Sequence, residues 1–193
     1  MKKGSGIIIV LAILAILVLW AVKAYNGLVG QDETVTAAWS QVENMYQRRA
    51  DLIPNLVATV KGYAEHEQET FEAVVAARAK ATQVTVNDLS EESVRNFQKA
   101  QGEVSSALGR LLAVVENYPE LKANENFLDL QAQLEGTENR IAEARRSFNE
   151  AARKYNTQVR SFPANLIAGA FGFSTKGYFT AEESASQAPK VEF

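Results

Sequence analysis

The 193-residue sequence contains no cysteine and a single histidine, His66. The absence of cysteine excludes disulfides, thiol nucleophiles and thiolate-ligated zinc. A helical zinc motif would need a second histidine four residues after His66, and that position is Thr70. The sequence also lacks a Gly-x-Ser-x-Gly turn and any phosphate-binding glycine motif. We therefore predict a protein that is not an enzyme and has no cofactor or metal.

Positive charge is scarce beyond the first 23 residues. The chain has a net charge of -3, and Lys2, Lys3 and Lys23 all flank the N-terminal segment, so the body alone carries -6. Nucleic-acid binding requires a basic surface to neutralise phosphates. We therefore expect no nucleic-acid partner. The apolar content of 47% is sufficient for a folded domain.

One long hydrophobic run is present, because the 19 residues between Lys3 and Lys23 are uncharged and Ile7 to Val22 are all apolar. As a helix the uncharged run would measure about 28 Å, close to the roughly 30 Å of a bilayer's hydrocarbon core. This predicts a short tail at 1–6 and a transmembrane helix at 7–23. The expected anchor positions are Ile7, Leu11, Leu14, Leu17 and Trp20, the last at the interface.

Two other interpretations of this run stay open. It could be a cleaved signal peptide, with Val22-Lys23-Ala24 as a poor cleavage site, or a buried core helix. If it is an anchor, Lys2 and Lys3 outweigh Lys23, and the positive-inside rule places the N-terminus in the cytoplasm. The body would then lie on the non-cytoplasmic side.

Gly27 and Gly30 predict a linker at 24–31, and the body that follows has the periodicity of long helices. Three apolar seams advance in steps of three and four residues, as in coiled coils. The first seam is Val35, Trp39, Val42, Tyr46, Ile53, Leu56, Val60 and Tyr63, interrupted by Arg49. The second is Val94, Phe97, Gln101, Val104, Leu108, Leu111, Val115 and Tyr118, with Asp88 or Ser90 as its cap. The third repeats every seven residues, at Phe127, Leu134, Ile141, Phe148, Tyr155 and Phe162.

These seams predict an all-α fold. We expect an elongated antiparallel up-and-down bundle at 32–173, made of three long helices plus a short C-terminal helix. The first helix, from Asp32 to about Thr82, would be about 75 Å long and so much longer than the second. Pro54 is the expected place for a bend, unless a new helix starts near Asp51 and places the proline in a first turn.

The segment from Arg48 to Val57 has the most unusual local chemistry. Arg49 falls on the apolar seam, where an unpaired charge would cost several kcal/mol, so we expect it to pair with Asp51 or with an acid among residues 138–150. A kink whose buried ion pair fixes helix register is one interpretation, and a site for a partner or ligand is the other. The candidate residues are Arg48, Arg49, Asp51, Pro54 and Asn55.

Pro163 predicts the end of the third helix, and an apolar stretch follows it up to Phe173. The stretch is too short to span a bilayer, so its aromatics must be covered. A short helix over the open end of the bundle would do this, and so would a contact with a subunit or with the membrane surface. Residues 174–193 are predicted to be a partly ordered tail. The expected docking residues are Phe162, Pro163, Phe171 and Phe173.

Specific motifs accompany this pattern over nearly the whole chain. They are Tyr25-Asn26-Gly27-Leu28-Val29, Trp39, the Arg48-to-Val57 stretch, Lys61-Gly62-Tyr63, Glu67, Ala77-Arg78-Ala79, Tyr155-Asn156, Phe162-Pro163-Ala164-Asn165, Phe171-Gly172-Phe173, Tyr178-Phe179 and the terminal Pro189-x-Val191-x-Phe193. With them the sequence resembles the LemA family. The resemblance implies a bacterial membrane protein with a long-helix bundle of bromodomain-like, four-helix topology, no known catalytic activity and no established cofactor.

The sequence thus favours a non-enzymatic scaffold or adaptor in the bacterial inner membrane. Its expected partners are the lipid bilayer and either further copies of itself, as a homo-oligomer, or another membrane protein. The alternative is a domain that senses a small molecule or a metal near the expected helix break at Pro54.

Overall fold

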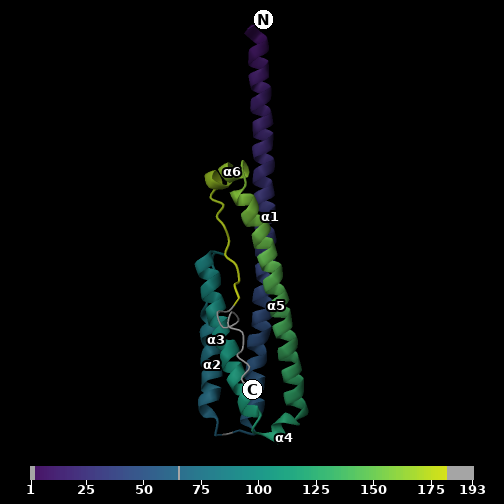
Figure 1. Cartoon of the computed structure of the whole chain (residues 1–193), viewed down its shortest axis with the longest axis vertical. Coiled ribbons are helices and arrows are strands. Elements are labelled where there is room, and N and C mark those ends of the chain that lie inside the picture. Colours follow the sequence, from purple (N-terminus) through teal and green to yellow (C-terminus); the bar gives the residue numbers. More distant parts are fainter. Residues whose placement is uncertain (1–2, 65, 182–193) are drawn as a thin grey trace, which may run out of the picture.

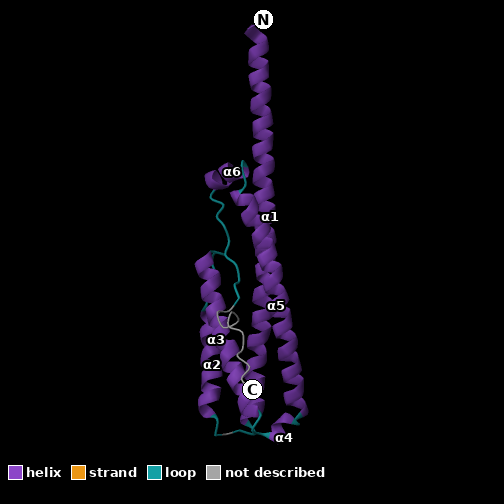
Figure 2. Cartoon of the chain, viewed as in Figure 1, coloured by secondary structure: helices purple, strands orange, loops and turns teal. Residues whose placement is uncertain are grey.

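The computed structural model describes residues 3–64 and 66–181 (Figure 1). This part of the chain is helical apart from connecting loops and an extended C-terminal segment (Figure 2). The helices are α1 (Lys3–Lys61), α2 (Gln68–Gln83), α3 (Glu91–Val115), α4 (Pro119–Lys122), α5 (Glu125–Arg160) and α6 (Ala164–Phe171). The predicted all-α class, with an apolar N-terminal helix and a short C-terminal one, is confirmed.

Helix α1 runs without interruption for 59 residues, from the apolar segment into the bundle. The predicted linker at 24–31 was wrong, because these residues are helical and Leu28 is buried in the core. The predicted bend at Pro54 was wrong as well, since α1 continues through it to Lys61. The chain instead reverses after Gly62, and α2 is a separate helix. The bundle therefore has four packed helices where three long ones were expected.

Helix α1 packs along α5, and α2 packs against α3 (Figure 1). The seams are confirmed: all eight first-seam positions from Val35 to Val60, counting Arg49, are 0–6% exposed, and the ninth position, Tyr63, is 41% exposed. Of the seven-residue repeat, Phe162 is the exception, with 79% of its surface exposed. It lies beyond the end of α5, as expected from Pro163. Ser90 caps α3 by accepting a hydrogen bond from the Ser93 backbone N–H.

The interior consists of two hydrophobic clusters stacked along the bundle. We call the cluster nearer the apolar segment the proximal core and the other the distal core. The proximal core is rich in aromatics and includes Leu28, Val35, Trp39, Val42, Tyr46, Phe97, Ile141, Phe148, Tyr155 and Phe179. The distal core is mainly aliphatic and includes Ile53, Leu56, Val60, Phe71, Val74, Val104, Leu108, Leu111, Phe127 and Leu134.

After α6 the chain turns at Gly172, which has a positive φ of 76°, and continues as an extended segment to residue 181 (Figure 2). This segment contacts α3 through Gln98 and α5 through Asn149 and Asn156. The predicted partly ordered tail is therefore a packed element as far as residue 181. Residues 182–193, with the motif that ends at Phe193, lie outside the described residues.

Candidate functional site

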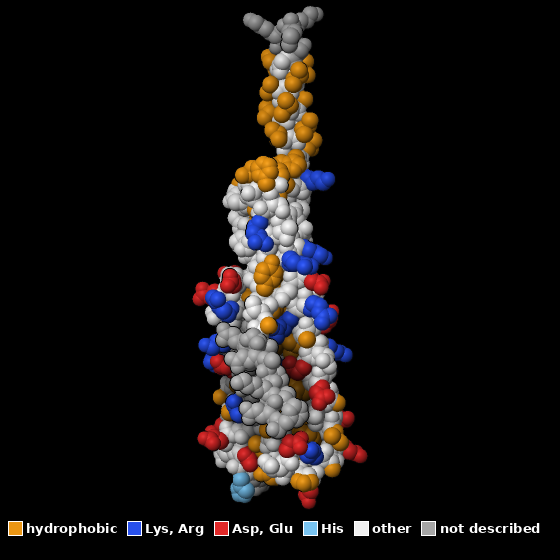
Figure 3. Space-filling model, in the orientation of Figure 1, with side chains coloured by type: hydrophobic (Ala, Val, Ile, Leu, Met, Phe, Trp, Pro, Cys, Tyr) orange, Lys and Arg blue, Asp and Glu red, His pale blue; other side chains and the backbone are white. Residues whose placement is uncertain are grey.

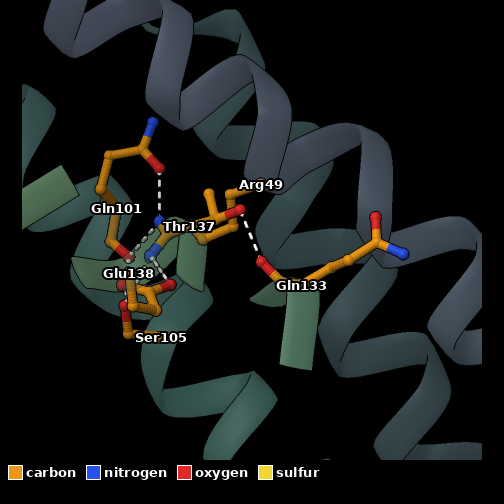
Figure 4. A network of polar contacts seen from close by, with 6 residues as sticks. All are labelled: Arg49, Gln101, Ser105, Gln133, Thr137 and Glu138. Atoms are coloured by element: carbon orange, nitrogen blue, oxygen red, sulfur yellow. Dashed lines mark hydrogen bonds and ion pairs between the residues drawn. The ribbon is translucent and has the colours of Figure 1, made fainter. Parts of the chain in front are cut away.

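A layer of polar side chains separates the two cores. Arg49 of α1 is 2% exposed, and its Nη1 donates to Ser105 Oγ at 2.8 Å and to Glu138 Oε1 at 3.0 Å. Its Nη2 donates to the backbone oxygen of Gln101 at 3.1 Å and to its Oε1 at 2.6 Å (Figure 4). The predicted pairing of Arg49 with an acid of the third long helix is confirmed, and Asp51 is not its partner.

This network explains how a guanidinium is held inside the bundle. The Arg49 Nη1 has partners on α3 and α5, and its Nη2 has partners on α3. The guanidinium carbon also lies 4.9 Å from the centre of the Tyr46 ring. Glu138 is 42% exposed and so keeps part of its hydration, which limits the desolvation cost of the pair. Burial raises the pKa of Tyr46, against the lowering effects of Arg145 and Arg49. The layer therefore fixes the register of α1, α3 and α5 by hydrogen-bond geometry.

A second arginine explains why Pro54 does not break α1. A proline inside a helix leaves the carbonyl four residues earlier without its usual N–H partner, and here that carbonyl belongs to Ala50. The Nε of Arg78, on α2, donates to the Ala50 oxygen at 2.7 Å. The side chain of another helix thus replaces the lost backbone hydrogen bond. Sequence reasoning missed this role, although Ala77-Arg78-Ala79 was among the motifs singled out.

The other residues of the predicted Arg48-to-Val57 site do not gather around Arg49. Arg48, Asp51, Pro54 and Asn55 are all exposed. The Asp51 carboxylate accepts a hydrogen bond from Gln47 Nε2 at 2.8 Å on the same helix. The sequence therefore predicted the buried charge correctly but not a cluster, because these side chains point around a continuous helix rather than into a kink.

A small cavity borders the polar layer between α1, α2 and α3. Its volume is about 140 Å³, and its lining includes Glu43, Tyr46, Arg49, Arg78 and Gln101. Pockets for drug-sized ligands measure roughly 300–1,000 Å³, so this one would hold only a ligand of a few atoms. Among the described residues, no group of three or more His, Asp or Glu side chains is arranged to hold a metal.

Side-chain amides hold the extended C-terminal segment by imitating a β-ladder. Asn149 donates to the Phe179 oxygen at 2.8 Å and accepts from its N–H at 2.9 Å. Asn156 pairs with Lys176 in the same way, at 2.8 Å in both directions. Asn156 and Phe179 belong to motifs singled out in the sequence, but this contact was not predicted, and Asn149 was not singled out. Their signal was present: the two asparagines are seven residues apart, each directly after an aromatic of the third seam.

The segment also supplies an aromatic side chain to the proximal core. Phe179 is 5% exposed and stacks on Trp39, with 5.8 Å between the ring centroids and 11° between the ring planes. Gly177 passes so close to α3 that an added Cβ would lie 2.7 Å from the Glu91 Cα.

An ion pair lies beside the segment, because Lys176 Nζ is 2.7 Å from Asp32 Oδ1. Burial and the nearby Asp32 raise the pKa of Tyr155 to about 12.

The predicted anchor residues all lie on the part of α1 that projects beyond the bundle (Figure 1). Within the described chain, α1 is the one helix long and apolar enough to cross a membrane, and that stretch is unburied. The exposed fractions of its residues are 63% for Ile7, 59% for Leu11, 52% for Leu14, 54% for Leu17 and 37% for Trp20.

The predicted docking residues divide into two groups. Phe173 packs on the proximal core, and Pro163 is partly buried. Phe162 and Phe171 stay exposed, at 79% and 63%. Helix α6 therefore packs on α1 and α5 but leaves Phe162 and Phe171 largely exposed.

Comparisons with known proteins agree with the resemblance in the sequence. The sequence pattern of the LemA family matches residues 38–193. The magnetosome protein MamQ 2 of Paramagnetospirillum magneticum (strain ATCC 700264 / AMB-1) is 29% identical over 98% of this chain and 78% of its own length. Protein LemA of Metamycoplasma hominis (strain ATCC 23114 / DSM 25592 / NBRC 14850 / NCTC 10111 / PG21) is 23% identical over 82% of this chain and 69% of its own length. With its unburied apolar helix, the chain is therefore a membrane-associated member of the LemA family.

Proposed function

We propose that the chain is a non-enzymatic membrane scaffold, which binds a protein partner or assembles with copies of itself. The observation that carries this proposal is the continuity of α1 from the apolar segment to the far end of the bundle. A helix of 59 residues is about 88 Å long and has no flexible joint at which the body could swivel. Such a rod holds the bundle in a fixed position relative to the anchor.

The polar layer supports a structural role in preference to a catalytic one. The Arg49 guanidinium donates to Gln101, Ser105 and Glu138. Because these hydrogen bonds join α1, α3 and α5, the strongest buried polar groups are used to hold the rod together.

Photo-crosslinking in intact membranes tests the scaffold. A crosslinking amino acid at Val75 or Leu128, both exposed on the body, should capture a defined adduct with another copy or with one membrane protein. Inserting a short Gly-Ser segment after Tyr25 should abolish that adduct by making α1 flexible. The matched control inserts seven helix-forming residues at the same place, which preserves helical phase and should retain it. A chain that yields no adduct at exposed body positions would contradict the proposal.

We also propose that the anchor crosses the bacterial inner membrane once, with the bundle on the non-cytoplasmic side. Lys2 and Lys3 outweigh Lys23, which supports a cytoplasmic N-terminus. Because the chain has no cysteine, a single cysteine introduced at Asp129 can be labelled without background. A membrane-impermeant maleimide should modify it from outside intact spheroplasts. Labelling only after lysis would place the bundle in the cytoplasm.

The cavity beside the polar layer favours a second candidate function, the sensing of a very small ligand. Its guanidinium and carboxylate lining lies where α1, α2 and α3 meet, so an occupant would contact all three helices. A thermal-shift screen of small organic anions and divalent metals tests this, because a ligand at 100 times its Kd should add about 2.7 kcal/mol. Thr82→Met, which lengthens a side chain at the cavity, should abolish a genuine shift. A screen without any stabilising compound would exclude this candidate.

A further inference from the structure

Helix α6 lies at the level where the anchor leaves the bundle (Figure 1). It packs against both α1 and α5. The ring of Tyr25, on α1, contacts those of Phe171 and Phe173, with centroid distances of 4.9 Å and 5.6 Å. Tyr25 follows the last residue of the uncharged run, Val22, by three positions, or about 4.5 Å along the helix. If the anchor spans a bilayer, α6 therefore lies beside the membrane surface.

Three large apolar side chains in and beside α6 are exposed. Phe162, Leu166 and Phe171 are 79%, 61% and 63% exposed. Figure 3 shows hydrophobic side chains gathered at this end of the body, directly where the apolar helix emerges, whereas charged side chains are spread over the rest of the visible face. A contiguous exposed apolar patch marks a surface that contacts a partner or a membrane.

The sequence around α6 lacks the groups that a water-exposed helix usually carries. No charged residue occurs from Ser161 to Thr175, a stretch that includes the whole of α6. The basic residues beside it are Arg160 and, on the adjacent anchor, Lys23, because Lys176 is mostly buried and pairs with Asp32. An apolar stretch flanked by basic residues suits the boundary between headgroups and acyl chains, where cations can meet lipid phosphates.

We propose that α6 is a second membrane contact, which lies in the interfacial layer of the same bilayer that the anchor crosses. Phe162, Leu166 and Phe171 insert among the lipid chains. We call α6 with these three side chains the foot, and Tyr25 connects it to the anchor. The inference rests on the membrane anchoring in the proposed function but not on any protein partner. It commits to lipid because the exposed face is continuous with the lipid-facing surface of the anchor.

The consequence is a defined orientation of the body. A single transmembrane helix can tilt over a wide range, and neighbouring interfacial groups determine the angle it adopts. A foot placed on one side of α1 restricts tilt toward or away from that side. The foot and the uninterrupted α1 would together set the direction in which the bundle points from the membrane.

Spin-label accessibility in the full-length protein tests this. Single cysteines at Leu166 and Phe171, in liposomes of phosphatidylcholine and phosphatidylglycerol, would each carry a nitroxide. Leu14, in the middle of the apolar run, serves as the membrane reference and Arg153, exposed on α5, as the water reference. The α6 labels should be more accessible to oxygen than to a polar nickel complex, at a depth of about 5–10 Å in the headgroup and acyl boundary.

The other outcomes overturn the proposal in distinguishable ways. If the α6 labels match Arg153 while Leu14 reports lipid, the foot is wrong and the anchor stands. If Leu14 also matches Arg153, the anchoring itself fails. Dipolar broadening at positions 166 and 171 that disappears on dilution with unlabelled chain would show a second copy on this face instead of lipid. Phe171→Trp in a Trp20→Phe background gives an independent readout: brominated lipids should quench the new tryptophan, whereas Trp39, buried in the proximal core, should remain as unquenched background emission.

Discussion

The proximal and distal halves of the bundle share α1, α3 and α5 but are closed by different elements. In the distal half a regular helix, α2, completes the core. In the proximal half the extended segment at 172–181 takes that place, and it pairs its backbone with side-chain amides of α3 and α5. The difference shows that a helical bundle can be closed by a strand-like segment where the neighbouring helices supply the missing hydrogen bonds.

Helix α2 and the extended segment at 172–181 should differ in how cooperatively they unfold with the rest of the bundle. Helix α2 satisfies its own backbone and contributes Phe71 and Val74 to the distal core. The extended segment depends on Asn149, Asn156 and one buried aromatic ring, so it can open while the helices stay packed. The membrane-proximal half is therefore expected to contain the first part of the body to open.

The largest expected effect comes from truncating that aromatic side chain. Phe179→Ala should weaken the docking of the extended segment by about 3–5 kcal/mol, because it empties a site beside Trp39 and Phe148. Hydrogen exchange at residues 174–180 measures this opening. The matched control, Phe127→Ala in the distal core, should cost a similar amount in global unfolding but leave those amides protected. Equal loss of protection in all helices of the Phe179→Ala protein would contradict local opening.

The polar layer between the halves gives the second largest effect. Arg49→Ala should lower the unfolding free energy by about 3 kcal/mol, since it leaves the buried Oε1 of Gln101 unpaired. Replacing both Arg49 and Gln101 with apolar side chains, as in Arg49→Met with Gln101→Leu, should recover most of the lost unfolding free energy. Denaturant unfolding in detergent, followed by circular dichroism, measures both. A double variant less stable than Arg49→Ala would show that the layer supplies net stability and not only register.

The third prediction concerns Pro54 and Arg78, in the distal half. Arg78→Met should cost about 1–3 kcal/mol, because the Ala50 carbonyl then has no partner. In a Pro54→Ala background the residue at 54 has its own N–H for that carbonyl, so the same substitution should cost clearly less. A double-mutant cycle measured by thermal unfolding gives the coupling. Strictly additive effects would show that Arg78 does not compensate for the proline.

These cases show what can be predicted from the sequence. The helical seams and the need of Arg49 for a carboxylate follow from periodicity and from the cost of a buried charge, both of which are local properties of the chain. The compensation of Pro54 by Arg78 and the amide clamps on the extended segment depend on which elements meet in space. Asn149 and Asn156 resemble ordinary surface residues of a helix until a segment without periodicity is placed beside them.

The smallest effects are expected from substitutions at the helix N-caps, one in each half of the bundle. In the proximal half, the hydroxyls of Ser93 and Ser90 hydrogen-bond Asp88 and lower the pKa of its carboxyl from 3.8. The folded state thus favours ionised Asp88, so this stabilisation is present above the unfolded pKa and is lost as the pH falls through the lower, folded one. In the distal half, the neutral Asn124 caps α5 by accepting from the Phe127 N–H at 3.0 Å.

Substitutions at these caps should therefore respond differently to acid. Ser90→Ala and Asn124→Ala should each cost about 1 kcal/mol near neutral pH, as expected for a lost N-cap. The cost of Ser90→Ala should shrink as the pH falls through the lowered pKa of Asp88, because protonation of Asp88 then weakens that network in the native protein. The cost of Asn124→Ala should not change with pH, since its cap has no titrating group. Thermal unfolding of both variants from neutral to acidic pH measures the comparison, and parallel profiles would refute an acid-sensitive proximal cap.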